Sequence, residues 1–419
     1  MTLIERDSVA IAAAQHVRFF PMAVVSARGA ILVDEAGREL VDLSGGWSAA
    51  AVGYAHPRVI EAVDAAVRTM PGVGILSGTH RPGVELAERL LEMVPTRGDG
   101  PRAVYVGLAG SDANTAAIRA IRAWSDRPTI LAFESSYHGG MGPSQQVSGL
   151  FAAEDVPTDS QVVLVSYGDL GAVSAALAGR DVAAVFVEPI LSDGGLIIPP
   201  AEFLPGLRAL CDDTGTLLVA DEVKVGMGRT GRFLAHQCDG IEADLVSLGK
   251  SLGGGLPLSA LIGPRAVLDS DAGGTLLTTA GNPVACAAGL AVLDIVQSER
   301  LAERAAALGV DLAARLGALL ARHELVAAVR SRGLVGGIEL RTADGRPARG
   351  ETAKVVFRAA QLGAVLYYVG SDSNVLELTP PLVIEEEELA RGLAIVSRAI
   401  TDVETGLVDD AEVAAFAGW

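Results

Sequence analysis

The chain has 419 residues, of which 50% are hydrophobic, and a formal net charge of −18 at pH 7. This length exceeds that of most single-core domains, so we expect a large domain and a smaller second one. The acidic balance and the lack of any block of lysine and arginine argue against a nucleic-acid partner. Three scattered cysteines without metal-ligand spacing, and no signal or membrane-spanning run, predict a cytoplasmic protein that binds no metal and enters no membrane.

Short apolar runs alternate with helical patterns through the middle of the chain, as is typical of strand and crossover-helix units in a mostly parallel sheet. The predicted strands are 103–106, 129–133, 161–165, 183–188, 217–221, 245–248 and 258–262, and the predicted helices are 112–124, 170–178 and 203–213. The pattern is helical from 283 to about 323. Strands then follow at 334–340, 364–368 and 375–378, with a final helix from about 385.

This order of elements predicts an α/β protein whose large domain has a mostly parallel central sheet flanked by helices. We expect the large domain to span 49–305 and a smaller α+β domain to span 306–419. The N-terminal segment, 1–48, is expected to join the small domain. Chemistry in such a sheet gathers at the carboxyl ends of the strands.

A glycine turn follows the first strand of this series and opens a helix. Backbone amides and the positive end of the helix dipole would face an anion there, so Gly110 and Ser111 are candidate phosphate ligands. The turn could equally be an ordinary one in which Ser111 or Asp112 caps the helix. Tyr137, after the next strand, can cover one face of a planar ligand, although half-buried tyrosines are also common packing residues.

Lysine is rare, since Lys224, Lys250 and Lys354 are the three in the chain. Lys250 lies beside a glycine run that leaves room for a ligand against the backbone. Asp221 ends a very apolar strand and therefore needs a partner for its charge. A lysine and a buried aspartate are what pyridoxal phosphate requires, the first as Schiff base and the second against the ring nitrogen. A plain loop lysine and a buried ion pair are the alternatives.

Together these segments resemble the class III aminotransferase family, whose members bind pyridoxal phosphate and have fold type I. Residues 221–231, DEVKVGMGRTG, are similar to the family's DEVQTGxGRTG. Leu248-Gly249-Lys250 resembles its Schiff-base lysine motif, and Gly281-Asn282-Pro283 resembles its GNP turn. The match is distributed over nearly the whole chain.

The resemblance implies a role for each matching residue. Lys250 would carry the cofactor, Asp221 would pair with its ring nitrogen, and Val223 would pack under the ring opposite Tyr137. The implied phosphate ligands are Gly110, Ser111 and, toward the neighbouring subunit, Thr278. Such a shared site implies a homodimer.

Two positions depart from the family pattern, and finer motifs indicate a subgroup. Ala109 stands where many relatives have serine or threonine, and Lys224 stands where they usually have glutamine, near the ring oxygen of the cofactor. Lys224 is therefore a second amine in the site and a rival to Lys250. The subgroup resembled is that of α-amino-ε-caprolactam racemase and the amino acid amide racemases, through residues 18–21, 42–47, 110–114, 188–195, 221–226, 253–260, 367–370 and 416–419.

Glu377 favours racemisation of a substrate without a free carboxylate. Many family members have an arginine three residues before a Pro-Pro pair, where it clamps the substrate carboxylate. Glu377 occupies that place ahead of Pro380-Pro381. It would repel a carboxylate, so an amide or lactam fits better, unless Glu377 faces solvent or an arginine elsewhere.

Asp193 favours racemisation because proton groups must stand on both faces of the reacting carbon. Lys250 would serve one face. Asp193 matches the acidic residue proposed as the opposite base in the lactam racemase, although it could be a turn residue before two glycines. Trp47 and Tyr137 would flank the substrate. The sequence thus predicts a racemase of α-amino lactams or amino acid amides; the alternatives are an aminotransferase using an oxo acid and an epimerase of free branched amino acids.

Overall fold

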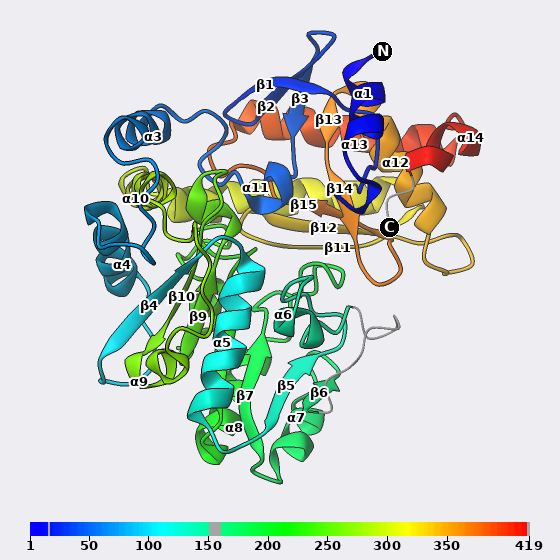
Figure 1. Cartoon of the computed structure of the whole chain (residues 1–419). Helices are drawn as coiled ribbons and strands as arrows, with labels where there is room; N and C mark the ends of the chain where they lie inside the picture. Colours follow the sequence, from blue (N-terminus) through cyan, green and yellow to red (C-terminus); the bar gives the residue numbers. More distant parts are fainter. Residues whose placement is uncertain (16, 151–160, 417–419) are drawn as a thin grey trace.

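The computed structural model describes the chain except residues 16, 151–160 and 417–419, so all but the first residue of the terminal stretch 416–419 lies outside the described residues. Figure 1 shows one part built on a large sheet and another built on two smaller sheets, with the helices α1 and α14 in the latter. The helices are α1 Leu3–Ala10, α2 Gly45–Ser48, α3 Pro57–Thr69, α4 Arg81–Met93, α5 Gly110–Trp124, α6 Pro143–Gln146, α7 Leu170–Leu177, α8 Phe203–Thr214, α9 Arg265–Leu268, α10 Pro283–Ser298, α11 Leu301–Arg322, α12 Arg349–Leu362, α13 Glu386–Glu404 and α14 Asp410–Val413.

The large sheet has the strand order β4-β10-β9-β8-β7-β5-β6. Its strands are β4 Arg102–Gly107, β5 Thr129–Phe133, β6 Val162–Val165, β7 Val182–Val187, β8 Leu217–Asp221, β9 Leu245–Leu248 and β10 Ser259–Pro264. All are parallel except β10, which runs antiparallel to both β4 and β9. Successive side chains point to opposite faces, so Ile130 packs in the cluster with α5 while Leu131 packs in the larger core. This burial on both faces explains the continuous apolar runs.

Two four-stranded sheets form the rest of the molecule, with orders β1-β2-β3-β13 and β11-β12-β15-β14. Their strands are β1 Val24–Arg28, β2 Ile31–Asp34, β3 Glu39–Asp42, β11 Val326–Arg332, β12 Val335–Leu340, β13 Ala364–Val365, β14 Tyr367–Val369 and β15 Val375–Leu378. The chain passes from the first sheet to the second at Leu366. Because β13 pairs in parallel with β3, the N-terminal segment shares a sheet with the C-terminal part.

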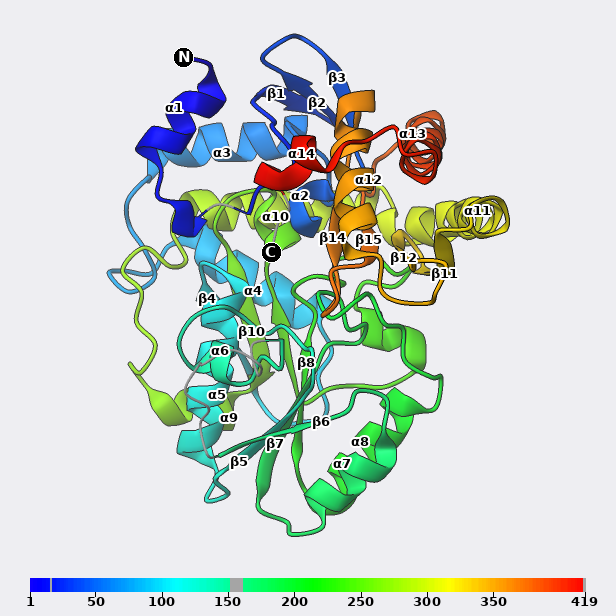
Figure 2. The same cartoon turned by 90° about the vertical axis from the view of Figure 1, so that its right-hand side faces the viewer.

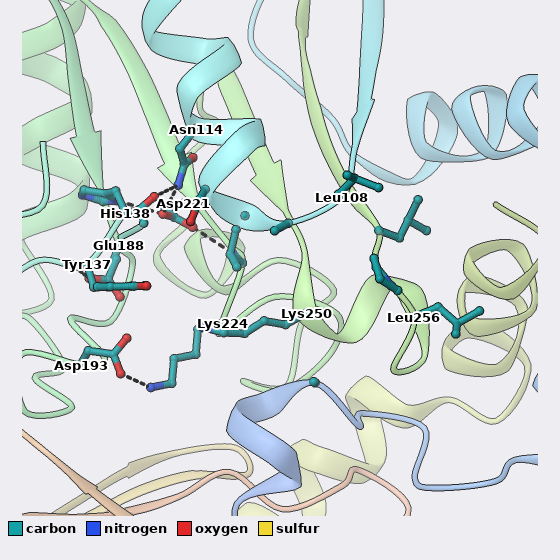
Figure 3. A pocket seen from close by; sticks show the side chains of 18 of the residues that line it. Leu108, Asn114, Tyr137, His138, Glu188, Asp193, Asp221, Lys224, Lys250 and Leu256 are labelled. Atoms are coloured by element: carbon teal, nitrogen blue, oxygen red, sulfur yellow. Dashed lines mark hydrogen bonds and ion pairs between the residues drawn. The ribbon is translucent and has the colours of Figure 1, made fainter. Parts of the chain in front are cut away.

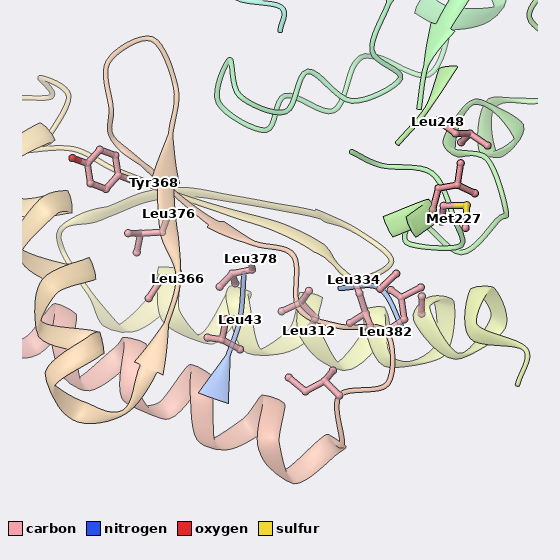
Figure 4. Packing of buried hydrophobic residues seen from close by; sticks show 14 of the residues in the cluster. Leu43, Met227, Leu248, Leu312, Leu334, Leu366, Tyr368, Leu376, Leu378 and Leu382 are labelled. Atoms are coloured by element: carbon pink, nitrogen blue, oxygen red, sulfur yellow. The ribbon is translucent and has the colours of Figure 1, made fainter. Parts of the chain in front are cut away.

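An extended apolar cluster lies beneath these sheets. Figure 4 shows Leu43, at the end of β3, near Leu366 and Leu378, and Leu312 of α11 beside Leu382. All five side chains are almost completely removed from solvent. At about 1.5 to 3 kcal/mol for each fully buried leucine, this core is what holds the two chain ends together.

The expected α/β class with a mostly parallel sheet is confirmed, and β5, β8 and β9 have the predicted bounds. The helical stretch 283–323 divides into α10 and α11 at Arg300, whose φ of 52° interrupts the helix. The predicted strand 364–368 divides into β13 and β14, which belong to different sheets. Within the described residues, every helix is too short or too polar to cross a membrane. The boundaries at 48/49 and 305/306 stay a prediction.

Candidate active site

A cavity of about 450 Å³ opens at the carboxyl ends of the large sheet's strands. Its chemically active lining residues come from the segments after β4, β5, β7, β8 and β9, as the strand order requires. Among the predicted site residues, those that line it are Gly110, Ser111, Tyr137, Asp193, Asp221, Val223, Lys224 and Lys250. Figure 3 shows Tyr137, Asp193 and Glu188 on one side of the two lysines and Leu108 on the other.

Asp221, at the end of β8, lies in a network of buried hydrogen-bond donors. Asn114 Nδ2 donates to Asp221 Oδ2 at 2.8 Å, and His138 Nδ1 lies 2.8 Å from the same oxygen. The other oxygen accepts the amide of Val223 at 3.0 Å. Figure 3 shows these contacts between α5 and the β5 and β8 loops. The network holds the carboxylate in one orientation at the base of the cavity.

The glycine turn before α5 packs closely against the segment after β8. A Cβ atom on Gly110 would lie 2.7 Å from Val223 Cγ1, so only glycine fits there. The amides of Gly110 and Ser111 open the helix and have no acceptor in a preceding turn. Asp112 does not compete for them, because its carboxylate accepts the amides of Leu108 and Ala109 at 2.7 and 2.8 Å. The first turn can therefore take an anion.

Lys250 begins a 3-10 turn after β9 with a left-handed φ of 43°. Strained backbone of this kind persists where the surroundings enforce it. Its amine forms no hydrogen bond or ion pair with the described part of the chain. Burial lowers the pKa of Lys250, and the charge of Lys224 lowers it further. The amine is thus held toward its neutral, nucleophilic form.

Lys224 joins Asp193 and Glu377, the two acidic residues from which the sequence predicts racemisation. Its ammonium lies 2.7 Å from Asp193 Oδ1 and 2.8 Å from Glu377 Oε1. It also lies 5.5 Å from the centre of the Trp47 ring, within the range of a cation–π contact. Glu377 is 1% exposed and is not a lining residue of the cavity, so it acts on the site through Lys224.

The charges in this cluster affect one another. Burial opposes ionisation of Asp193, but the Lys224 and Lys250 charges outweigh it and hold the pKa of Asp193 below its usual value. Burial likewise opposes the charge on Lys224, yet the two carboxylates raise the pKa of Lys224 above its usual value. Burial raises the pKa of Glu377, with Lys224 opposing the rise.

Glu188, directly after β7, connects two loops of the site. Its Oε1 accepts the amide of Tyr137 at 2.9 Å, and its Oε2 accepts the amide of Ser192 at 3.2 Å. Burial, together with Asp193 and Asp221, raises the pKa of Glu188 to about 7, although His138 opposes the rise. Glu188 therefore fixes the tyrosine loop relative to the loop that carries Asp193.

Two predicted residues lie outside the cavity lining. Trp47 stacks on Tyr367, with ring centroids 4.5 Å apart, and reaches the site by covering Lys224. Thr278 is exposed on a surface segment. Its contact with a neighbouring subunit stays a prediction.

Three further residues that line the cavity were not among the predicted site residues: Asn114, His138 and Glu188. Asn114 follows Gly110 by four positions, which places both on one face of α5, and this spacing could have identified it. His138 is adjacent to Tyr137, and Glu188 directly follows a fully buried strand, so both could have been inferred to need partners.

Comparisons with known proteins agree with this arrangement. The family model for class-III aminotransferases matches residues 11–400. The chain belongs to the class III aminotransferase family. The isoleucine 2-epimerase of Lentilactobacillus buchneri is 35% identical, covering 100% of this chain and 98% of that protein. The acetylornithine aminotransferase of Mycolicibacterium smegmatis is 38% identical, covering 88% and 91%.

The fold agrees with that of a solved aminotransferase as well. The crystal structure of ornithine aminotransferase from Toxoplasma gondii has a TM-score of 0.87 and 28% identity, covering 96% of this chain and 95% of that one. The chain therefore has the fold of the pyridoxal phosphate aminotransferases, and its cofactor is pyridoxal 5′-phosphate.

The residues present fit this cofactor. His138 Nε2 and Asn114 Oδ1 are buried without a hydrogen-bond partner in the described residues, as expected of a wall built to face a polar ligand. Lys250 would bond to the cofactor, Asp221 would face its ring nitrogen, and the first turn of α5 would hold its phosphate. Lys224 is occupied by two carboxylates, which makes Lys250 the better candidate for the bond.

Proposed function

We propose that this class III family member is a pyridoxal phosphate-dependent racemase that inverts the α-carbon of an α-amino lactam or an amino acid amide, such as α-amino-ε-caprolactam. The observation that carries the proposal is that an amine and a carboxylate, Lys250 and Asp193, line the same cavity. A relative named isoleucine 2-epimerase, similar over the full length, supports chemistry at an α-carbon.

The proposed reaction uses one proton group on each face of the substrate. Pyridoxal phosphate, when bound, supplies an electron sink that makes the α-proton removable. Lys250 is suited to accept that proton on one face because its lowered pKa favours the neutral amine. Asp193, ionised beside Lys224, is suited to accept it on the other. Inversion follows when one group removes a proton and the other returns one.

The charges around the cavity support a substrate with a masked carboxyl group. The described lining residues include no arginine that could clamp a carboxylate. The ammonium of Lys224 is already shared by Asp193 and Glu377, so it is not free to pair with a substrate carboxylate. A neutral amide or lactam avoids the repulsion that a free carboxylate would meet.

Two other functions have specific support. An aminotransferase would use the same cofactor residues, and the relative named acetylornithine aminotransferase is 38% identical. An epimerase of free branched amino acids would use the same two proton groups, and the isoleucine 2-epimerase is similar over its whole length. The aminotransferase requires an oxo acid, whereas the epimerase and the racemase do not.

The test is to incubate the holoenzyme with one enantiomer of α-amino-ε-caprolactam in deuterated water without any oxo acid. We expect inversion with deuterium at the α-carbon. A parallel incubation with L-isoleucine distinguishes the epimerase. Amine transfer that depends on an oxo acid, without inversion of either substrate, would contradict the proposal.

The variant Asp193→Asn tests the proposal that two bases act on opposite faces of the substrate. We expect Asp193→Asn to keep cofactor absorbance but to lose racemisation by about a hundredfold or more, because general acid–base catalysis contributes on that order. Deuterium exchange should persist for the enantiomer whose proton faces Lys250. Full racemase activity in this variant would show that Asp193 has only a structural role in the turn.

We also propose that the active form is a homodimer in which Thr278 of one subunit reaches the phosphate site of the other. The support is local: Thr278 lies on an exposed segment beside apolar side chains that face solvent in the single chain. Those side chains are Val73, Ile75, Leu76 and Leu276. Exposed apolar patches of this kind mark interaction surfaces.

A further inference from the structure

The loop that carries Asp193 is a tight turn in an unfavourable backbone conformation. Leu191 and Ile197 exchange two backbone hydrogen bonds, and the amide of Leu196 donates to Ser192 O at 2.8 Å. Leu196 has a left-handed φ of 53°, which costs a leucine on the order of 1 kcal/mol or more. Such a conformation persists only when neighbouring structure holds it.

The turn is held by the sheet β11-β12-β15-β14, here called the C-terminal sheet, whose strands are distant from the turn in the sequence. Arg330 of β11 donates from Nε to Leu196 O at 2.8 Å and from its guanidinium to Gly195 O. The amide of Gly370, after β14, donates to Asp193 O at 2.9 Å. Both sides of the turn are therefore tied to one sheet.

The sheet is also shaped to seat the turn. Leu196 is fully buried against Gly337 of β12, where an added Cβ would lie 3.1 Å from Leu196 Cδ2. Arg330 is itself oriented by Glu339, since its Nη1 lies 2.9 Å from Glu339 Oε2. Only 21% of the Arg330 side chain is exposed, so these charge-assisted bonds are partly shielded from water.

We infer that Arg330 is a positioning residue for Asp193. By binding the two carbonyls that follow Asp193 in the turn, it sets where the carboxylate stands, while Lys224 holds the carboxylate itself. This inference rests on the proposed racemase function. Because a displacement of about 1 Å can reduce a rate on the order of a hundredfold, loosening the turn should impair the proton group on one face only.

The experiment compares α-deuterium exchange from each enantiomer separately in the Arg330→Met holoenzyme. We expect exchange to fall about tenfold or more for the enantiomer that Asp193→Asn also affects, and to change less than about twofold for the other. Amide hydrogen exchange of residues 190–197 should increase in the same variant. Arg330→Lys keeps the charge but not the forked geometry, so its exchange rate for the affected enantiomer should lie between those of the unmodified enzyme and Arg330→Met. This variant replaces Arg330→Met if the methionine variant folds poorly.

Arg341→Met is the matched control, because Arg341 pairs with the other oxygen of Glu339 at 2.8 Å but does not contact the turn. It should leave both exchange rates unchanged. Equal losses for both enantiomers in Arg330→Met would overturn the inference while leaving the racemase proposal intact. If Asp193→Asn itself shows no preference between enantiomers, the two-base function fails instead.

Discussion

At the scale of single residues, the site depends on two lysines with different partners. Lys224 is fixed between Asp193 and Glu377 and covered by Trp47, whereas Lys250 has no such partner in the described structure. The ammonium of Lys224 therefore does two things: it keeps Asp193 ionised, and it opposes a second positive charge on Lys250. Neither group is an ordinary surface lysine.

Lys224→Met should move the pH dependence of cofactor attachment upward. Burial and the Lys224 charge both lower the pKa of Lys250, so removing that charge raises this pKa and leaves less neutral amine near pH 7. A pKa that is one pH unit higher reduces the neutral fraction of the amine about tenfold. The measurement is the rate at which the cofactor-free enzyme takes up pyridoxal phosphate as a function of pH.

Lys354→Met is the control for that variant, since Lys354 pairs with Asp410 at the surface and should not affect the profile. Removing Lys224 leaves two buried carboxylates unpaired, which destabilises a protein by about 3–5 kcal/mol. The double variant Lys224→Met/Glu377→Gln removes one of these negative charges as well and serves as the second variant. An unchanged or downward-shifted profile in both would contradict the assigned coupling between the lysines.

At the scale of elements, the proposed cofactor site depends on how closely α5 approaches the segment after β8. Gly110 opens α5 against Val223, and Asn114, one turn later, reaches Asp221 at the end of β8. The start of α5 and the end of β8 are thus packed as one unit. This unit fixes the distance between the proposed phosphate contact and the proposed ring-nitrogen contact.

Gly110→Ala should weaken cofactor binding. Its Cβ would lie 2.7 Å from Val223 Cγ1, so the valine or the helix start must move. We expect the Kd for pyridoxal phosphate to rise about tenfold, a loss of about 1.4 kcal/mol, measured by titration of the cofactor-free enzyme. Gly317→Ala in α11 meets no atom within 4 Å and should instead stabilise the fold by about 0.5–1 kcal/mol without changing the Kd. Equal affinity of both variants would contradict the packing argument.

At the scale of the whole molecule, the N-terminal and C-terminal parts meet in one shared sheet, where β13 pairs with β3. The other small sheet, β11-β12-β15-β14, lies over the side of the cavity that carries Asp193. Figure 2 shows β14 and β15 above the large sheet's strand ends. Changes in the C-terminal sheet are therefore expected to reach the proton chemistry without touching the cofactor.

Leu276→Asp tests the proposed dimer. Leu276 is 61% exposed beside the exposed Ile75 and Leu76, and a charge there would have to be buried in the proposed interface. We expect sedimentation velocity to show dimers for the unmodified enzyme and a shift toward monomer, with loss of activity, for the variant. Leu407→Asp, at the same exposure elsewhere, should remain dimeric. A monomeric, fully active unmodified enzyme would contradict the shared site.

Some elements were predictable because their physical determinants are local. The strands β5, β8 and β9 are short apolar runs buried on both faces, so their bounds are visible in the sequence. By contrast, β1 is largely exposed, with Val25 59% accessible, and it forms a strand because β2 pairs with it. The local sequence pattern does not predict such an edge strand.

The sequence by itself determined the α/β class, because short apolar runs mark the strands, and it determined the family and the cofactor through residues 221–231, 248–250 and 281–283, which resemble the class III motifs. Only the tertiary structure decided what the charges near them do. Lys224 lies 31 positions from Asp193 and 153 positions from Glu377 along the chain, yet its one ammonium contacts both carboxylates. Ion pairs depend on distance in space, and the folding of the C-terminal sheet over the cavity sets that distance.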